Sequence, residues 1–113
     1  MSYLPSHGDI IYLEFDPQKG HEQKGRRPAL IVSNSTFNAF TNLAIVCPIT
    51  NTDRGFPLHV SLDERTKTSG VIMCEQLKSL DIKARGCSFV EVLPDDLLEE
   101  VVDIINGFIE IER

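Results

Sequence analysis

Apolar and polar side chains alternate along several short segments of the chain, and this period of two predicts β-strands. The clearest case is residues 9–15, where Ile11, Leu13 and Phe15 fall on one face and Tyr12 and Glu14 on the other. Continuous apolar runs elsewhere predict strands that are buried on both faces. Together these patterns predict strands at residues 9–15, 29–32, 43–47, 58–62, 70–81 and 87–92.

Three positions within these strands qualify the pattern. Pro48 lacks an N–H donor, so we expect the apolar strand before it to end there or to lie at a sheet edge. The polar pair at residues 75–76 interrupts an apolar stretch and predicts a bulge or kink. His59 alternates with inward-facing apolar residues and is therefore expected to point outward.

Helical spacing occurs in two places. Residues 36–40 are expected to form one helical turn, because the preceding Ser and Asn residues are good caps. Pro94 and two aspartates after it are typical of a helix start, and a helix of about four turns should follow. Its core face is expected to consist of Leu97, Val101, Ile104, Ile105 and Phe108.

These elements define a fold class. Several short strands, turn signals and a terminal helix predict a mainly β fold with α-helices (α+β). We expect a small sheet or barrel of strongly bent antiparallel strands, with a short helix after the second strand and a C-terminal helix. The 113 residues are long enough to bury a core and are expected to form a single domain, 1–113.

Residues 16–28 differ from everything around them, because they contain no aliphatic or aromatic side chain. Two glycines and two prolines favour irregular backbone, and Lys19, Lys24, Arg26 and Arg27 outnumber the acids. A connection of this length inside a compact domain usually binds or catalyses something. We therefore interpret residues 16–28 as a functional loop.

Charge is unevenly distributed, which matters for the choice of partner. The net charge of −6 argues at first against a polyanionic ligand. However, residues 91–113 hold eight acidic residues against one arginine, a net −7, which leaves +1 for the first 90 residues. A local basic site is therefore possible, provided that the acidic segment points elsewhere.

Composition also bears on location. The N-terminus has neither the basic region nor the apolar stretch of a signal peptide, and no apolar run is long enough to span a bilayer. We therefore expect a cytoplasmic protein without a membrane partner. The three cysteines are in apolar or alternating segments and show no close metal-binding pair, so we interpret them as small buried residues.

Four motifs, in this order along the chain, resemble the MazF/PemK toxin family. They are Gly8-Asp9-Ile10-Ile11-Tyr12, the stretch Gly20-His21-Glu22-Gln23-Lys24-Gly25-Arg26-Arg27-Pro28-Ala29, Cys47-Pro48-Ile49-Thr50 and Glu75-Gln76-Leu77-Lys78-Ser79-Leu80. The resemblance covers nearly the whole chain. It implies an SH3-like barrel that forms homodimers.

The resemblance also implies an activity. Members of the family are toxin endoribonucleases that cut single-stranded RNA at short sequences without a metal or other cofactor, leaving a 2',3'-cyclic phosphate and a 5'-hydroxyl. The family's catalytic Arg and Thr fall on Arg27 and Thr50. An arginine stays protonated and can stabilise charge on a phosphorane, while a threonine hydroxyl can fix the phosphate geometry. Glu22, the carboxylate within the family's motif, is the candidate general base.

Four further residues are candidates for substrate binding. Gln23 and Lys24 belong to the same basic loop, and Gln76 and Lys78 belong to the fourth motif. An amide can read a base edge and an ammonium can meet a phosphate, although both types are also common on exposed strands. The implied partners are single-stranded RNA, a second copy of the chain and an antitoxin whose acidic segment would be attracted to the basic loop.

Two alternatives belong to other functional classes. The first alternative is a gyrase poison, because a related toxin family of the same fold blocks DNA gyrase. That family looks like it depends on a C-terminal Trp, and this chain contains no Trp. The other alternative is a noncatalytic RNA-binding module in which Arg27 grips phosphate without cleavage.

Overall fold

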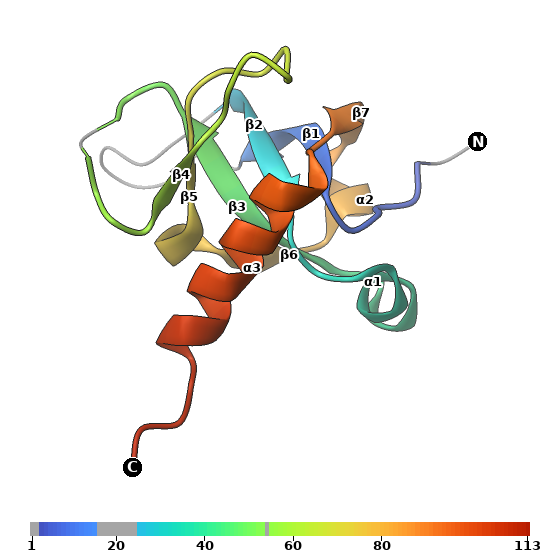
Figure 1. Ribbon diagram of the computed structural model, residues 1–113. Helices are drawn as coiled ribbons and strands as arrows, with labels where there is room; N and C mark the ends of the chain where they lie inside the picture. Colours follow the sequence, from blue (N-terminus) through green and yellow to red (C-terminus); the bar gives the residue numbers. More distant parts are fainter. Residues whose placement is uncertain (1–2, 16–24, 54) are drawn as a thin grey trace.

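The computed structural model describes residues 3–15, 25–53 and 55–113. Within them the chain forms a mostly antiparallel sheet accompanied by helices (Figure 1). The elements in chain order are β1 (Asp9–Phe15), β2 (Gly25–Ile31), α1 (Ser35–Thr41), β3 (Ala44–Thr50), β4 (His59–Ser61), β5 (Val71–Met73), the 3-10 turn η1 (Cys74–Gln76), β6 (Lys78–Leu80), α2 (Ile82–Arg85), β7 (Cys87–Val92) and α3 (Asp95–Phe108).

β3 is the central strand, and the sheet bends around it. The strand order is β4-β5-β3-β2-β1-β7, and β6 pairs with β3 outside this path. One edge of β3 pairs with β2, whereas its other edge pairs with β6 at Ala44 to Val46 and with β5 at Ile49 and Thr50. The structure thus confirms the α+β fold of bent antiparallel strands, including the kink at Glu75–Gln76, which is the turn η1.

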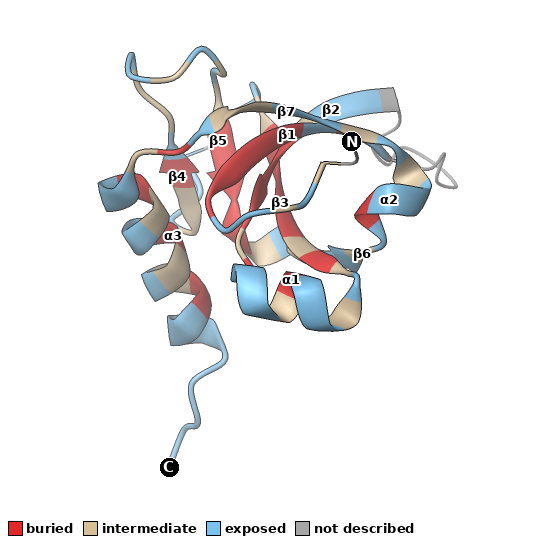
Figure 2. Cartoon of the chain, turned by 90° about the vertical axis from the view of Figure 1, so that its right-hand side faces the viewer, coloured by how far each residue is buried: buried red, intermediate tan, exposed pale blue. Residues whose placement is uncertain are grey.

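Each face of the sheet carries its own apolar cluster (Figure 2). One cluster joins Ile10, Leu30 and Ile72 to the buried residues Leu97, Val101 and Ile105 of α3. The second joins residues such as Leu13 and Val46 to Ile82 of α2, with Tyr3 packed against it. The core face expected for the C-terminal helix is largely confirmed, since Ile104 packs on the first cluster, whereas Phe108 is 41% exposed.

Helix ends are set by local hydrogen bonds. The Asn34 side chain accepts from the Phe37 N–H at 2.8 Å and caps α1. The Asp81 side chain accepts from Ala84 N–H and caps the short helix α2, which the sequence pattern did not predict. Four residues are too few to show a helical period in the sequence. No helix among the described residues is long and apolar enough to cross a membrane.

The predicted loop 16–28 is too long at its C-terminal end. β2 already begins at Gly25, and its residues 25–28 pair with β1 in the register Leu13↔Arg27 and Glu14↔Arg26. This part of the strand is held by backbone pairing, and its side chains at Arg26 and Arg27 are exposed. It therefore shows no alternation of apolar and polar residues from which a strand could be predicted. Residues 16–24 lie outside the described part of the chain.

Pro48 also departs from its prediction. It neither ends β3 nor lies at an edge, but is buried and pairs with Ala29 of β2. Its position falls between the β6 and β5 ladders, opposite η1, where the other edge of β3 has no described strand partner. A residue without an N–H is tolerated at such an interruption.

Candidate functional site

Arg27 and Thr50 reach the same end of two neighbouring strands. The ladder between β2 and β3 runs from Ile31↔Val46 to Ala29↔Pro48. Arg27 on β2 and Thr50 on β3 each lie two residues beyond its last pair, so both extend past the same end of this ladder. Arg27 is exposed and Thr50 is partly exposed. The structure thus places two residues that are 23 positions apart in the sequence on adjacent strands, beyond the same end of the ladder that joins them.

The position of Thr50 is fixed by its backbone neighbours. Its hydroxyl oxygen accepts from the Thr52 N–H at 3.2 Å, an interaction that leaves the hydroxyl proton available to a ligand. Gly70 packs so closely that a Cβ there would lie 2.3 Å from the Thr50 carbonyl oxygen. With a φ of +115°, Gly70 adopts a conformation that other residues rarely enter.

Thr50 lies at the wall of a groove of about 460 Å³. Strand ends and turns from β3, β4 and β5 surround this groove, and its lining is half polar. The lining residues are Thr50, Thr52, Phe56, His59, Met73, Glu75 and Gln76.

The groove contains a hydrogen-bonded pair of side chains that sequence reasoning missed. His59 Nε2 lies 3.1 Å from Glu75 Oε2, and the two side chains are 9% and 26% exposed. His59 thus lies on the strand face opposite the core residue Val60, as we expected, but it is covered there rather than exposed. It lies opposite Met73 in the β4–β5 ladder, and Phe56 meets its ring edge-on with centroids 5.1 Å apart. Because His59 and Glu75 are 16 residues apart in different elements, no local pattern revealed the pair.

The remaining predicted site residues fall into two groups. Gln76 lines the groove, and Lys78 follows it on β6 opposite Val46, so both belong to the edge of β3 that borders the site. Glu22, Gln23 and Lys24 lie outside the described residues.

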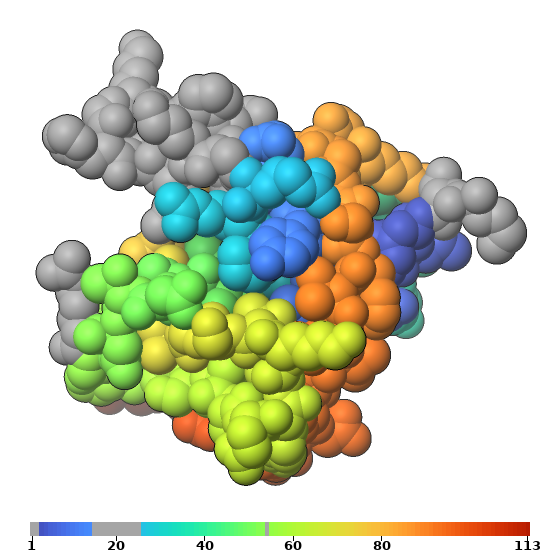
Figure 3. All heavy atoms as spheres, turned by 90° about the horizontal axis from the view of Figure 1, so that it is seen from above, coloured from blue at the N-terminus to red at the C-terminus, as the bar shows by residue number. Residues whose placement is uncertain are grey.

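Arg26 is held on the other side of β2. Its guanidinium donates to the Ser88 hydroxyl of β7 at 2.6 Å, across β1. Figure 3 shows β1, β2 and β7 as neighbouring blue, cyan and orange surfaces. Successive side chains of a strand point to opposite faces, so the neighbours Arg26 and Arg27 serve different surfaces.

The thiols near the groove are poor nucleophiles. Burial raises the pKa of Cys47 to about 12 and that of Cys74 to about 11. Both therefore remain neutral at physiological pH and act as small apolar residues. Among the described residues, no three His, Cys, Asp or Glu side chains lie together as metal ligands would.

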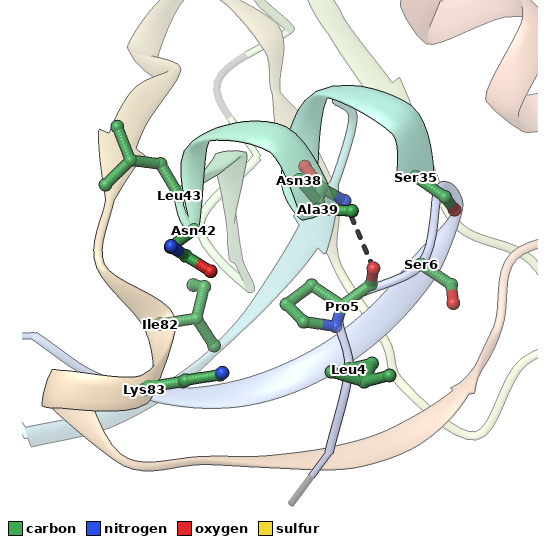
Figure 4. Close-up of a pocket in the computed structure, with 10 residues that line it drawn as sticks. All are labelled: Leu4, Pro5, Ser6, Ser35, Asn38, Ala39, Asn42, Leu43, Ile82 and Lys83. Carbon is green, nitrogen blue, oxygen red and sulfur yellow. Dashed lines mark hydrogen bonds between the residues drawn. The ribbon is translucent and has the colours of Figure 1, made fainter.

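A second hollow lies between the N-terminal segment, α1 and α2 (Figure 4). The Asn38 side chain bridges it by donating to the Pro5 carbonyl at 3.2 Å. The lining is mostly apolar, with Leu4, Leu43 and Ile82 as its largest aliphatic groups. None of Arg27, Thr50, His59 and Glu75 borders it, so we place the functional site in the groove beside Thr50.

α3 packs against the elements that carry the groove, β4 and η1. Its apolar face meets them through residues such as Leu97 and Val101, while Glu99 and Asp103 stay exposed. The acidic helix thus adjoins the groove on one side, and Arg27 and Lys78 lie on the strands on the other. Any polyanion would be drawn to the strand side.

Comparison with known proteins agrees with this geometry. The family model described as PemK-like, MazF-like toxin of type II toxin-antitoxin system matches residues 6–109. The chain belongs to this family. It is 41% identical over 99 residues to the endoribonuclease PemK of Escherichia coli, covering 84% of this chain and 74% of PemK. It is 35% identical over 107 residues to the E. coli endoribonuclease toxin MazF, covering 95% and 96%.

Solved structures show the same relationship. MazF from Deinococcus radiodurans superposes with a TM-score of 0.87 at 36% identity, covering 97% of this chain and all of that one. A MazE-MazF complex from the same organism matches equally well, with 98% of this chain covered. The PemK/MazF resemblance noted from the motifs is therefore confirmed.

Proposed function

We propose that this chain is the toxin of a type II toxin-antitoxin system, a sequence-specific endoribonuclease that cuts single-stranded RNA, mRNA included. The observation that supports the proposal is that Arg27 and Thr50 lie beyond the same end of the β2–β3 ladder, where Thr50 lines an open groove. An exposed guanidinium next to a hydroxyl donor suits a phosphodiester whose charge increases during reaction. The endoribonuclease names of PemK and MazF support the same activity.

The proposed reaction is an internal transfer that needs no metal. The 2'-oxygen loses its proton and attacks the adjacent phosphorus, and the bond from phosphorus to the 5'-oxygen breaks. The products are a 2',3'-cyclic phosphate and a 5'-hydroxyl, which takes up the proton. Arg27 donates to phosphate oxygens as negative charge accumulates, so its effect is greater in the transition state than in the ground state.

Thr50 orients the phosphate, and a carboxylate supplies the base. The Thr50 hydroxyl already accepts from the Thr52 N–H, so its proton is directed to a phosphate oxygen. Glu22 is our candidate for removing the 2'-hydroxyl proton; it lies five residues before Arg27 in the sequence. Gln23, Lys24, Gln76 and Lys78 are proposed to hold the RNA strand.

The deciding experiment compares Arg27→Ala with Arg26→Ala, which remove the same charge from adjacent positions. Purified protein is incubated with a long RNA in excess chelator, and cut ends are mapped. We expect 5'-hydroxyl ends from the wild type, a loss of about 10²-fold to 10³-fold in rate for Arg27→Ala, and a much smaller loss for Arg26→Ala. Thr50→Ala should lose activity as well, with the folded state weakened by less than about 1 kcal/mol.

Other results would contradict parts of the proposal. If Arg27→Ala and Arg26→Ala lost the same fraction of the cleavage rate, Arg27 would contribute only general positive charge. If Arg27→Ala lowered the free energy of unfolding strongly, the role of Arg27 would be structural. Activity that disappears with chelator would rule out the metal-independent reaction. RNA binding without any cut would favour a noncatalytic module, and inhibition of DNA gyrase would favour the gyrase poison.

We also propose a partner. The D. radiodurans MazF structure with MazE is a toxin-antitoxin complex of the shared fold. An antitoxin for this chain would cover the site by placing an acidic segment against Arg27 and Lys78, because opposite charges give such contacts their fast association and specificity.

A further inference from the structure

Two polar atoms in the groove have no hydrogen-bond partner among the described residues. They are Nδ1 of His59 and Oε1 of Glu75, and both are buried. The His59 side chain is only 9% exposed, so water does not readily replace a partner. Buried polar groups are nearly always satisfied in folded proteins, and exceptions mark functional sites more often than chance would give. The pair is thus prepared for an external hydrogen-bond donor.

The chemistry of the pair shows which ligand groups fit. A carboxylate can only accept, so His59 Nε2 must donate to Glu75 Oε2 across their 3.1 Å contact. In a neutral imidazole this leaves Nδ1 as an acceptor. The two unpartnered atoms are therefore both acceptors, and a ligand must bring donors to them.

Among RNA bases, the donors of this kind are exocyclic amino groups. Adenine, cytosine and guanine each carry an NH₂ group with two N–H donors. Uracil has no amino group, and its single ring N–H lies between two carbonyl oxygens. Those carbonyls would face the acceptors of His59 and Glu75 without forming a bond, which makes uracil the poorest fit.

The walls of the groove suit a flat base. Phe56 is 44% exposed and its ring meets that of His59 edge-on, so a partly exposed aromatic side chain is available for stacking in the groove. His59 Nδ1 and Glu75 Oε1 are both buried in this structure. Base binding therefore requires the neighbouring Phe56 side chain to change rotamer before a base edge can reach them. An exposed ring such as Phe56 changes rotamer within picoseconds to nanoseconds. Thr50 borders the same groove, which places such a base next to the phosphate.

We propose that the His59–Glu75 pair, with Phe56, binds one RNA base carrying an exocyclic amino group beside the cleaved phosphate and excludes uracil there. This inference rests on the proposed endoribonuclease function and adds to it the chemical class of one recognised base. His59 and Glu75 act here as specificity residues, separate from the roles of Arg27 and Thr50.

The test is a cleavage-site profile on RNAs with a randomised segment. For the wild type, one position next to the cut should disfavour uracil by at least about tenfold, the discrimination that a good base contact provides. Replacing the favoured base by its deamino analogue at that position should reduce cleavage of a defined RNA by a similar factor. Equal use of uracil at every position, or full cleavage of the deamino analogue, would overturn the proposal.

The variant Glu75→Gln sharpens the test, because an amide nitrogen donates where a carboxylate oxygen accepts. It should restore uracil at this one position and leave the preference at all others unchanged. Glu64→Gln makes the same change of charge on an exposed loop and should keep the wild-type profile. A uniform loss of rate with an unchanged profile in folded Glu75→Gln would show that Glu75 does not read a base.

Failure of the proposed function can be told apart from failure of this inference. If the wild type cuts no RNA, the endoribonuclease proposal fails, and base reading is then measured by fluorescence anisotropy. Short RNAs that differ in one adenine or uracil are compared. A preference of about tenfold for adenine that Glu75→Gln abolishes would support the pair as a base reader, whereas equal affinities would overturn it.

Discussion

Gly70 is the residue on which the geometry of Thr50 depends most directly. Its φ is positive, and a Cβ at this position would lie only 2.3 Å from the Thr50 carbonyl oxygen, so there is no room for a side chain. The contact joins two segments, the end of β3 and the start of β5, at the groove. A change at Gly70 should therefore move a candidate catalytic residue from outside the site.

Gly70→Ala tests this coupling. We expect a loss of roughly 1–3 kcal/mol in the free energy of unfolding, from backbone strain and the displaced carbonyl. RNA cleavage at a temperature where the variant stays folded should fall as well, because Thr50 moves. Gly107→Ala is the matched control, since a Cβ there meets nothing within 4 Å. If Gly70→Ala were as stable and active as the control, Thr50 would not depend on this contact.

The sequence predicted the individual site residues unequally. Arg27, Thr50 and Gln76 came from the family-like motifs, and the β2–β3 ladder pairs the strands that carry the first two. His59 was expected on the outer face of its strand, and alternation alone favoured that interpretation. Its partner Glu75 comes from the turn after the next strand, so the contact depends on tertiary structure that alternation does not encode.

At the scale of elements, the segment between β4 and β5 is held by carboxylates. Glu91 of β7 accepts from the backbone N–H groups of Lys67 and Thr68, at 3.0 and 2.8 Å, and from the Thr68 hydroxyl. Arg65 joins Asp63 to Asp96 at the start of α3. These contacts fix the segment that leads to Gly70, and hence to the groove.

The same contacts make this segment sensitive to acid. Hydrogen bonds from Arg65 lower the pKa of Asp63 and of Asp96. Burial works against ionisation of Glu91, but hydrogen bonds from Lys67 and Thr68 outweigh it and lower its pKa too. A carboxyl whose pKa is lowered by folding stabilises the fold above its unfolded pKa and loses this contribution as pH falls through the folded value.

Glu91→Gln should therefore lower the free energy of unfolding at pH 7 by about 1 kcal/mol. As pH falls through the lowered pKa of Glu91, the wild-type carboxyl takes up its proton and the difference between the two proteins should shrink. Urea unfolding at pH 7 and at pH 3 measures both effects. Glu99→Gln, on the exposed face of α3, serves as the control. A difference that does not change with pH would mean that the charge of Glu91 is unimportant.

Among the elements, prediction succeeded where side chains alternate. β1 was predicted with its observed ends, Asp9–Phe15, because its inward positions are apolar throughout. The first half of β2 escaped notice because its ladder rests on backbone pairing of Gly, Arg and Pro residues. The strand containing Pro48 was expected to end there, but β3 continues to Thr50. Pro48 lies between the residues of β3 that pair with β6 and those that pair with β5, and this position can be recognised only in the assembled sheet.

At the scale of the whole molecule, apolar side chains remain on the surface. Phe40 of α1 is 89% exposed, and Leu4, which lines the hollow between α1, α2 and the N-terminal segment, is 69% exposed. Val92 is 60% exposed on β7, which ends the described strand order. Exposed apolar groups of this size commonly mark a protein interface.

We accordingly expect a homodimer, as the family resemblance implied. Light scattering after size exclusion should give about twice the 12.7 kDa of one chain at micromolar concentration. Phe40→Ser should shift the equilibrium towards monomer if α1 takes part in the contact, with Ser61, exposed on β4, changed to Ala as the control. A single-chain mass across the accessible concentrations would contradict the dimer.

The turn η1 has a consequence for how such a protein can diversify. In an unbroken strand, Glu75 and Gln76 would point to opposite faces, and one of them would belong to the core. The 3-10 turn lets both line the groove instead, while Cys74 keeps the buried position beside them. Single substitutions at the exposed Gln76 can thus alter the chemistry offered to RNA at little cost in stability. Recognition of a new RNA sequence is accordingly within reach of a few point mutations on an unchanged scaffold.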